Sequence, residues 1–296
     1  MRAPPVDRCL KPQNKYYLKG VSIIKSVLSY FLGNMYPHKN NENGTVTYET
    51  PFGKLTIRKN DVINEWTFAK GEYWSESDIR RNLTYISPGK NIIEIGAHCG
   101  THTLPYASAL SDGCSLYAFE PQPYMMECLR KTISDNHLDS KVKLFNNAVW
   151  YESCDLEMAE ICASPTAASY NQRLEDCHKN LTSTNYGAIC IGKGGTPAPA
   201  VCLDDPALGL ENIGFIHSDA EGSENLIFYG ARELIRRNRP VIYYENYRVC
   251  GSELFDHIRT HYTIPDEILY FNVKDYCMNE LGYRTYIHGQ DSYLIP

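Results

Sequence analysis

The stretch Asn91-Ile-Ile-Glu-Ile-Gly-Ala-His-Cys-Gly100 decides the fold. Its first five residues are mostly apolar, as in a strand that is buried on both faces. Gly96 and Gly100 then allow a sharp turn and a close approach of the backbone to a ligand. The next segment is predicted to be a helix whose first N–H groups point at that ligand. A strand, a glycine turn and a helix in this order are typical of a nucleotide-ligand site in a doubly wound α/β fold.

Glu94 lies two residues before the first glycine and places a negative charge at the end of this strand. The charge opposes a pyrophosphate and favours a ligand with an ammonium group or hydroxyls, such as S-adenosylmethionine. The Gly-x-x-x-Gly spacing also differs from the dinucleotide fingerprint. A dehydrogenase is therefore the least favoured enzyme class.

The length of 296 residues has room for one large α/β domain with an appendage, or for two small domains. We predict an N-terminal tail with a short helix over residues 1–44 and a main domain over residues 45–296. Residues 45–90 are interpreted as an accessory hairpin and helix. Residues 150–200 are rich in Ser, Thr, Ala, Asn and Gly and interrupt the alternation of strands and helices, so we predict an insert or lid over residues 160–200.

Charge and cysteine content narrow the partners and the compartment. The net charge of −6 gives no basic surface for nucleic acid. The stretch 21–32 is too short and too polar to span a bilayer, and it lacks the uninterrupted core of a signal peptide. The eleven cysteines are scattered without a C-x-x-C pair, which favours reduced thiols. We expect a cytoplasmic protein without stable membrane insertion, and no heptad indicates an oligomeric state.

Strand and helix patterns alternate along the main domain. The predicted strands are 45–50, 54–58, 91–95, 116–119, 142–149, 154–158, 213–217, 240–244, 283–287 and 292–295. The predicted helices are 22–31, one starting at Ser75, 104–110, 123–137, 225–237 and 252–261, and residues 38–44 are predicted to be a loop. This order predicts a Rossmann-like, doubly wound, seven-stranded sandwich whose last strand runs against the others, with an N-terminal helix and hairpin extension.

A second acidic residue, Glu120, follows the second strand of the main unit and precedes Pro121. A carboxylate at this point is placed to accept hydrogen bonds from ribose hydroxyls. Taken alone, Glu120 would be an ordinary exposed acid at a strand end, but the glycine turn one unit earlier favours the ribose role. Asn147 and Ala148, at the end of the third strand, could meet an adenine edge.

Six segments in a fixed order carry a family resemblance: 94–100, 117–121, 201–205, 216–224, 229–234 and 240–246. Together they resemble the FkbM-like family of class I S-adenosylmethionine-dependent methyltransferases, over roughly residues 45–295. The resemblance implies S-adenosylmethionine as the cofactor and an oxygen of a sugar, glycan or glycoside as the acceptor. Two residues depart from the family pattern, in which Asp is usual at Glu94 and Lys at His217.

The glycine turn and the resemblance together give the predicted cofactor-binding residues. They are Glu94, Gly96, Ala97, His98, Gly100, Thr101, His102, Glu120, Pro121, Asn147 and Ala148.

Asp219 and His217 are the predicted catalytic residues. A sugar hydroxyl is a poor nucleophile until a base takes its proton. Asp219 lies just past the carboxyl end of the fourth strand, where acceptors meet the cofactor in this fold. Strand alternation would put His217 on the same side, so that the two could act as a pair. The alternatives are a core histidine at 217, and a capping role for Asp219 on a helix starting at Gly222.

A divalent metal is a further possibility that we do not favour. Asp219, Glu221, Glu224 and Glu245 could hold Mg²⁺ or Ca²⁺ through oxygen ligands. Within this set, Asp219, Glu221 and Glu245 are the first candidates.

Two other functions stay open beside O-methylation of a sugar or glycan. One is a methyltransferase that acts on a nitrogen or carboxyl group of a protein or small molecule. The other is a cofactor-binding partner subunit without turnover, although Glu94, Gly96, Gly100 and Glu120 would form a complete cofactor site that such a subunit does not need.

Overall fold

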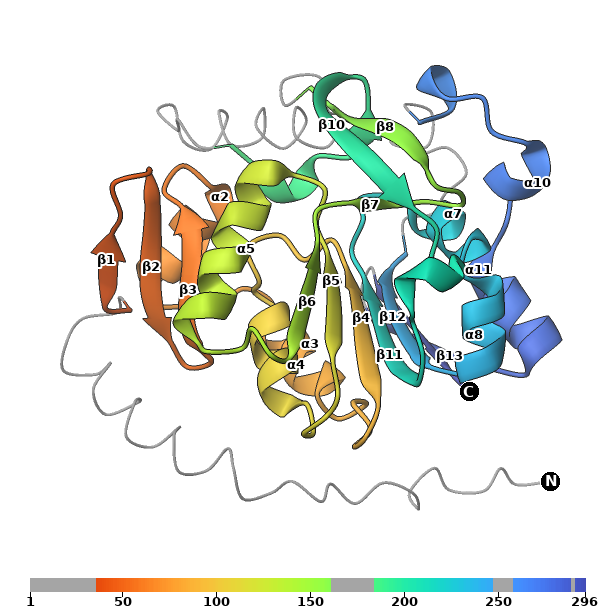
Figure 1. Cartoon of the computed structure of the whole chain (residues 1–296), viewed down its shortest axis with the longest axis horizontal. Helices are drawn as coiled ribbons and strands as arrows, with labels where there is room; N and C mark the ends of the chain where they lie inside the picture. Colours follow the sequence, from red (N-terminus) through yellow and green to blue (C-terminus); the bar gives the residue numbers. More distant parts are fainter. Residues whose placement is uncertain (1–35, 161–183, 247–257, 289–290) are drawn as a thin grey trace.

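The structure is a computed structural model that describes residues 36–160, 184–246, 258–288 and 291–296 (Figure 1). The predicted helix over 22–31 and most of the predicted helix over 252–261 lie outside these residues. In the described part of the chain, no helix combines the length and the apolar character needed to cross a bilayer.

A seven-stranded sheet forms the centre of the described chain, in the order β13-β14-β12-β11-β4-β5-β6. Strands β4, β5, β6, β11 and β12 are parallel, and β14 runs antiparallel to both of its neighbours. An α/β Rossmann-like fold is therefore confirmed. The strands are β4 (Asn91–Ile95), β5 (Leu116–Phe119), β6 (Val142–Phe145), β11 (Ile213–Ser218), β12 (Val241–Glu245), β13 (Arg284–His288) and β14 (Asp291–Ile295).

Helices cover both faces of this sheet, because the strand side chains alternate between two apolar clusters. On one face, Ile92 and Phe215 pack with residues of α4 (Thr103–Ala109) and α5 (Pro123–Asp135). On the other face, Ile93 and Ile216 pack with α7 (Glu224–Tyr229), α8 (Arg232–Asn238) and α11 (Val273–Asp275). Further helical segments after the accessory region described below are α3 (Glu76–Asn82), α10 (Asp266–Leu269), η2 (Tyr186–Ala188), η3 (Pro206–Leu208) and η4 (Tyr276–Glu280).

An accessory layer precedes the main unit and lies beside α5 (Figure 1). It contains β1 (His38–Asn40), β2 (Thr45–Thr50), β3 (Gly53–Arg58), α2 (Val62–Trp66) and η1 (Phe68–Lys70). The backbone N–H of Thr56 donates to Oγ1 of Thr132 on α5 at 3.0 Å. The predicted loop over 38–44 was partly wrong, because β1 pairs with β2 there despite its polar sequence.

A second, four-stranded sheet has the order β7-β10-β8-β9. Its strands are β7 (Ala148–Val149), β8 (Cys154–Ala159), β9 (Ile191–Gly192) and β10 (Gly194–Val201). The predicted end of the third strand at residue 149 was wrong, because β6 ends at Phe145. The segment predicted to be an insert or lid, residues 160–200, contributes β9 and most of β10 to this sheet. Pro197 and Pro199, which are rare residues within strands, obscured β10. They occupy exposed positions that alternate with buried Ala198 and Ala200.

The predicted helix over 225–237 is divided into α7 and α8 at Gly230. A Cβ atom at Gly230 would lie 2.7 Å from the carbonyl oxygen of Trp150 and 2.8 Å from Cα of Tyr151. Because backbone from the second sheet approaches this closely, a side chain and a continuous helix are both disfavoured here.

Candidate cofactor and acceptor site

The loop between β4 and α4 brings two distant parts of the chain together. Gly96 has φ +79°, and a Cβ atom there would lie only 1.9 Å from the carbonyl oxygen of Asp219. The N–H of Asp219 in turn donates to the carbonyl of Ile95 at 3.0 Å. The loop after β11 thus requires glycine at 96, whereas the close approach to a ligand stays a prediction.

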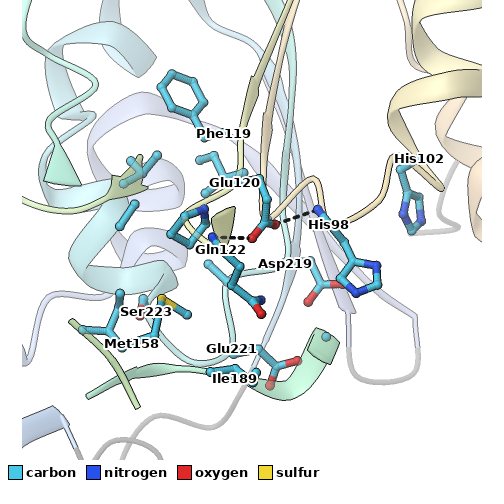
Figure 2. Close-up of a pocket in the computed structure, with 18 of the residues that line it drawn as sticks. His98, His102, Phe119, Glu120, Gln122, Met158, Ile189, Asp219, Glu221 and Ser223 are labelled. Carbon is cyan, nitrogen blue, oxygen red and sulfur yellow. Dashed lines mark hydrogen bonds between the residues drawn. The ribbon is translucent and has the colours of Figure 1, made fainter. Parts of the chain in front are cut away.

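Glu120 is 2% exposed and is held by two backbone donors (Figure 2). Its Oε2 accepts from the N–H of His98 at 2.7 Å, and its Oε1 accepts from the N–H of Gln122 at 2.8 Å. Burial raises the pKa of Glu120, while the charge of His98 and these two hydrogen bonds oppose the rise. Each carboxylate oxygen keeps a lone pair that can accept a ribose hydroxyl.

A pocket lies over this edge of the sheet and collects most of the predicted residues. Those that line it are Gly96, His98, Thr101, His102, Glu120, Pro121, Asn147, Ala148, Asp219 and Glu221. Glu94, Ala97, Gly100, His217 and Glu245 are not among the residues that line it. The amide of Asn147 already donates to the carbonyl of Pro199 at 3.1 Å.

Several pocket residues were not predicted. Met158, Ile189 and Ile191 come from the second sheet and the segment before it, while Ile63 comes from the accessory region. No local motif marks these four side chains, because they reach the pocket through contacts between distant segments. The sequence left open whether the aromatic residues before the helix at Ser75, which are Trp66, Phe68, Tyr73 and Trp74, form core or the wall of a cleft. Trp74 lines the pocket, whereas Phe68 and Tyr73 belong to the core.

Orphaned polar atoms indicate that the pocket fits a polar ligand. Oε1 of Gln122, Nδ1 of His98 and Oγ of Ser223 are buried without a hydrogen-bond partner among the described residues. The amide nitrogen of Gln122 donates to the carbonyl of Tyr186 at 2.9 Å, which orients Oε1. Since an unpaired buried polar group costs about 1–3 kcal/mol, these atoms are suited to receive partners from a ligand. Gln122 could have been found as the second residue after Glu120.

His217 lies behind the pocket, in the core. It is 3% exposed, its ring stacks on Tyr243 at 5.2 Å between centroids, and the ring of His102 is 4.5 Å away. Its Nδ1 is 4.0 Å from Oε1 of Glu94. Burial, reinforced by His102, lowers the pKa of His217 well below its usual range. The predicted pairing with Asp219 is wrong, because β11 ends at Ser218 and strand alternation stops before Asp219.

Asp219 lines the pocket and faces Glu245 at the end of β12. Burial raises the pKa of Asp219, and burial together with the charge of Asp219 raises the pKa of Glu245. The capping alternative for Asp219 is wrong, because α7 begins at Glu224 with Ser223 in the cap position. Asp219 is thus a carboxyl group with raised basicity at the carboxyl end of the parallel sheet.

Among the residues that the structure describes, two groups of side chains could hold a metal ion. Ligand atoms of Asp219, Glu221 and Glu245 lie within 4.8 Å of one another, as do those of Glu94, His102 and His217. The first group is the predicted acidic set, and its oxygen atoms suit Mg²⁺ or Ca²⁺. Use of a metal stays a prediction in either case.

Glu94 is buried at the centre of this arrangement, 1% exposed, and neither carboxylate oxygen has a hydrogen-bond partner among the described residues. Burial raises the pKa of Glu94 to about 8; Glu120 and Asp219 add to the rise, and Thr103 opposes it. With this pKa the carboxyl group of Glu94 would be mostly protonated at pH 7, in contrast to the fixed negative charge that we predicted for it.

The doubly wound sheet, the glycine turn and the carboxylate after the second strand define an α/β protein that binds a nucleoside-containing cofactor. The profile of the Methyltransferase FkbM domain matches residues 94–284. The chain therefore belongs to the FkbM methyltransferase family, and the matched domain is that of an S-adenosylmethionine-dependent methyltransferase.

The similarities to individual proteins are more distant than the match to the family profile. A ribosomal protein L11 methyltransferase from Carboxydothermus hydrogenoformans is 30% identical over 148 residues, which are 49% of this chain and 46% of that protein. The chain thus spans about half the length of this curated relative. Methyltransferase FkbM from Methylobacillus flagellatus aligns with 69% of this chain and 43% of its own at 14% identity and a TM-score of 0.40. TYW2 from P. horikoshii, in complex with MeSAdo, covers 96% and 83% at 11% identity and a TM-score of 0.39.

Proposed function

We propose that this protein transfers a methyl group from S-adenosylmethionine to a hydroxyl group of a sugar, glycan or glycoside. The observation that carries the proposal is the position of Asp219. Its carboxyl group lines the pocket, next to Gly96 and within the same cavity as Glu120. A base placed there can reach an acceptor that lies against the cofactor.

The residues of the pocket suit the parts of this cofactor. Glu120 would hold the ribose hydroxyls, and Gln122 together with Met158 and Ile191 would hold the adenine. When bound, S-adenosylmethionine supplies the methyl group from its sulfonium and leaves as S-adenosylhomocysteine.

Asp219 would remove the proton of the acceptor hydroxyl while the oxygen lone pair forms its bond to the methyl carbon. The raised pKa of Asp219 supports this role, because general-base efficiency increases as the pKa of the base approaches the operating pH. Glu245, which faces Asp219, would hold the carboxyl group in place and share its proton. Alignment of the acceptor oxygen with the methyl group would supply most of the remaining rate enhancement.

A nitrogen acceptor is the second candidate function. Asp219, Glu221 and Glu245 form an acidic set that would attract an ammonium group, and no lysine or arginine is among the described residues that line the pocket. The matched relative from C. hydrogenoformans is, by its name, a methyltransferase of a ribosomal protein.

Mass spectrometry of reaction products tests the two candidates directly. The protein would be incubated with S-adenosylmethionine and either a panel of glycosides or a panel of lysine-containing peptides. The proposal expects an added methyl group on an oxygen of a glycoside, formed far more slowly by Asp219→Asn. Methylation of peptide amines alone would overturn it in favour of the second candidate.

A further inference from the structure

Asp61 is a buried carboxylate outside the segment that matches the family. It follows β3, precedes α2 in the accessory layer, and is 0% exposed. Its Oδ1 accepts from the N–H of Ile63 at 2.9 Å, which caps α2. The other oxygen, Oδ2, is not needed for the cap and lies 3.2 Å from Nε2 of His98 in the glycine turn, at ion-pair distance but without hydrogen-bond geometry. Burial of a carboxylate costs free energy unless a partner such as an imidazole interacts with it.

The backbone around Asp61 is held on both sides. The N–H of Val62 donates to the carbonyl of Thr184 at 3.1 Å, and the N–H of Thr184 donates to the carbonyl of Asn60 at 2.7 Å. The amide of Asn60 donates to the hydroxyl of Tyr186 at 3.0 Å. Asp61 therefore has little freedom to leave His98.

His98 connects this carboxylate to the cofactor pocket. It has φ +50°, a left-handed conformation that is unusual for a residue with a side chain. That conformation directs its N–H to Oε2 of Glu120, while its ring lines the pocket. The chain of contacts thus runs from Asp61 through His98 to the carboxylate that would hold the ribose (Figure 2 shows the last step).

We propose that Asp61 is a positioning residue of the cofactor site, which fixes the ring of His98 and through it the turn that holds Glu120. The accessory layer, and not the family domain alone, then sets the affinity for the cofactor. This inference rests on the cofactor assigned above and is independent of the acceptor.

The charges around His98 agree with this arrangement. Burial lowers the pKa of His98, but Cys99 and Asp61 raise it by more, so that the pKa lies well above its usual range. Glu120 and Asp219 face it from the ends of β5 and β11, and His102 from the start of α4. Asp61 is one of the groups that raise the pKa of His98. Removing the charge of Asp61 should therefore lower that pKa, although Glu120 and Asp219 stay near the ring.

Asp61→Asn is the informative variant, since the Asn side chain still offers an oxygen to cap α2. We expect calorimetry with S-adenosylhomocysteine to show about tenfold weaker binding, by analogy with the loss of a carboxylate that orients a metal-binding histidine. Asp205→Asn is the matched control, because Asp205 likewise caps a short helix, through Ala207, and is not among the residues that line the pocket. It should bind as the wild type does.

Two further measurements separate positioning from general stability. In NMR titrations, the His98 signal, assigned by its loss in His98→Asn, should titrate at lower pH in Asp61→Asn than in the wild type. In the double variant, Asp61→Asn should weaken binding no further than His98→Asn alone. Equal titration, full additivity or wild-type binding in Asp61→Asn would each overturn the proposal.

His98→Asn tests the contact between Asp61 and His98 by changing the histidine. Asn suits this position because it tolerates a positive φ. If Asp61→Asn does not fold, wild-type affinity in a folded His98→Asn would overturn the proposal, and about tenfold weaker binding would support it. A wild-type protein that binds no S-adenosylhomocysteine would instead contradict the cofactor assignment itself.

Discussion

Asp219 and His217 are two residues apart, yet the structure gives them different surroundings. Asp219 lines the pocket, whereas His217 is stacked in the core behind His102. Side chains two residues apart lie on the same face of a sheet only within a strand, and β11 ends between these two residues. The distinction leads to opposite expectations for the two side chains in catalysis.

Asp219→Asn should lower kcat by about 10²–10⁴-fold, because the amide cannot accept the proton of the acceptor. Affinity for S-adenosylmethionine should stay close to that of the wild type, since Glu120 and the glycine turn are unchanged. Turnover assays and calorimetry on the same preparation check both points. Wild-type turnover in this variant would remove Asp219 from the mechanism.

Glu94 gives a prediction about stability and pH. Its pKa is about 8 in the folded protein, above its usual value of 4.5. The unfolded chain therefore loses this proton at lower pH, so the contribution of Glu94 is fully present below pH 4.5 and is lost as the pH rises toward 8. Glu94→Gln, which mimics the protonated form, should raise Tm by several degrees at pH 8 and by much less at pH 5.

Thermal unfolding without cofactor, at both pH values, measures this effect. Glu224, whose pKa is also raised to about 8 by burial, is present in both proteins and cancels in the comparison. An equal shift of Tm at the two pH values would contradict the prediction.

At the scale of elements, the turn between β4 and α4 was predictable, because its glycines and flanking apolar residues are local signals. Strand β10 was not, since Pro197 and Pro199 hide an alternation that becomes meaningful only when β8 is beside it. The pocket side chains Ile189 and Ile191, and the carboxylate of Asp61, were missed for a similar reason. Their roles depend on contacts with segments far away in the sequence.

Gly96→Ala should disturb the β4–α4 turn and the loop after β11 together. Its Cβ would meet the carbonyl of Asp219 at 1.9 Å, in addition to the cost of a positive φ. Gly44→Ala is the matched control, because Gly44 has a similar φ of +76° but faces open space. We expect a loss of about 1–2 kcal/mol in unfolding free energy for Gly44→Ala.

For Gly96→Ala we expect a larger loss of unfolding free energy, together with weaker binding of S-adenosylmethionine. Chemical denaturation and calorimetry on both variants provide the comparison. Equal losses in the two variants would mean that the loop relaxes around the added methyl group.

At the scale of the whole molecule, the family profile begins at Glu94, but residues before Glu94 also line the cofactor pocket. Ile63 and Trp74 line it from the preceding region. The doubly wound fold and the positions of Gly96 and Glu120 could be predicted from local patterns along one chain. The enclosure of the pocket could not be predicted in this way. It depends on how the seven-stranded sheet, the second sheet and the accessory layer pack together.

Turnover by the whole protein should survive dialysis against EDTA. Burial and mutual repulsion raise the pKa values of Asp219 and Glu245, so a shared proton can neutralise this pair without a cation. Activity assays before and after dialysis, with Mg²⁺ added back, make the test. Loss of activity that Mg²⁺ restores would assign the acidic set as a metal site.

The contact between Gly96 and the carbonyl of Asp219 also limits how such a protein can diverge. One backbone belongs to the turn at the cofactor and the other to the loop that carries the proposed base. A bulkier residue or a change of backbone path in either of these two segments would displace the other segment. New acceptor preferences would therefore arise by replacement of pocket side chains such as Met158, Ile189 and Ile191, while the two loops are inherited as one unit.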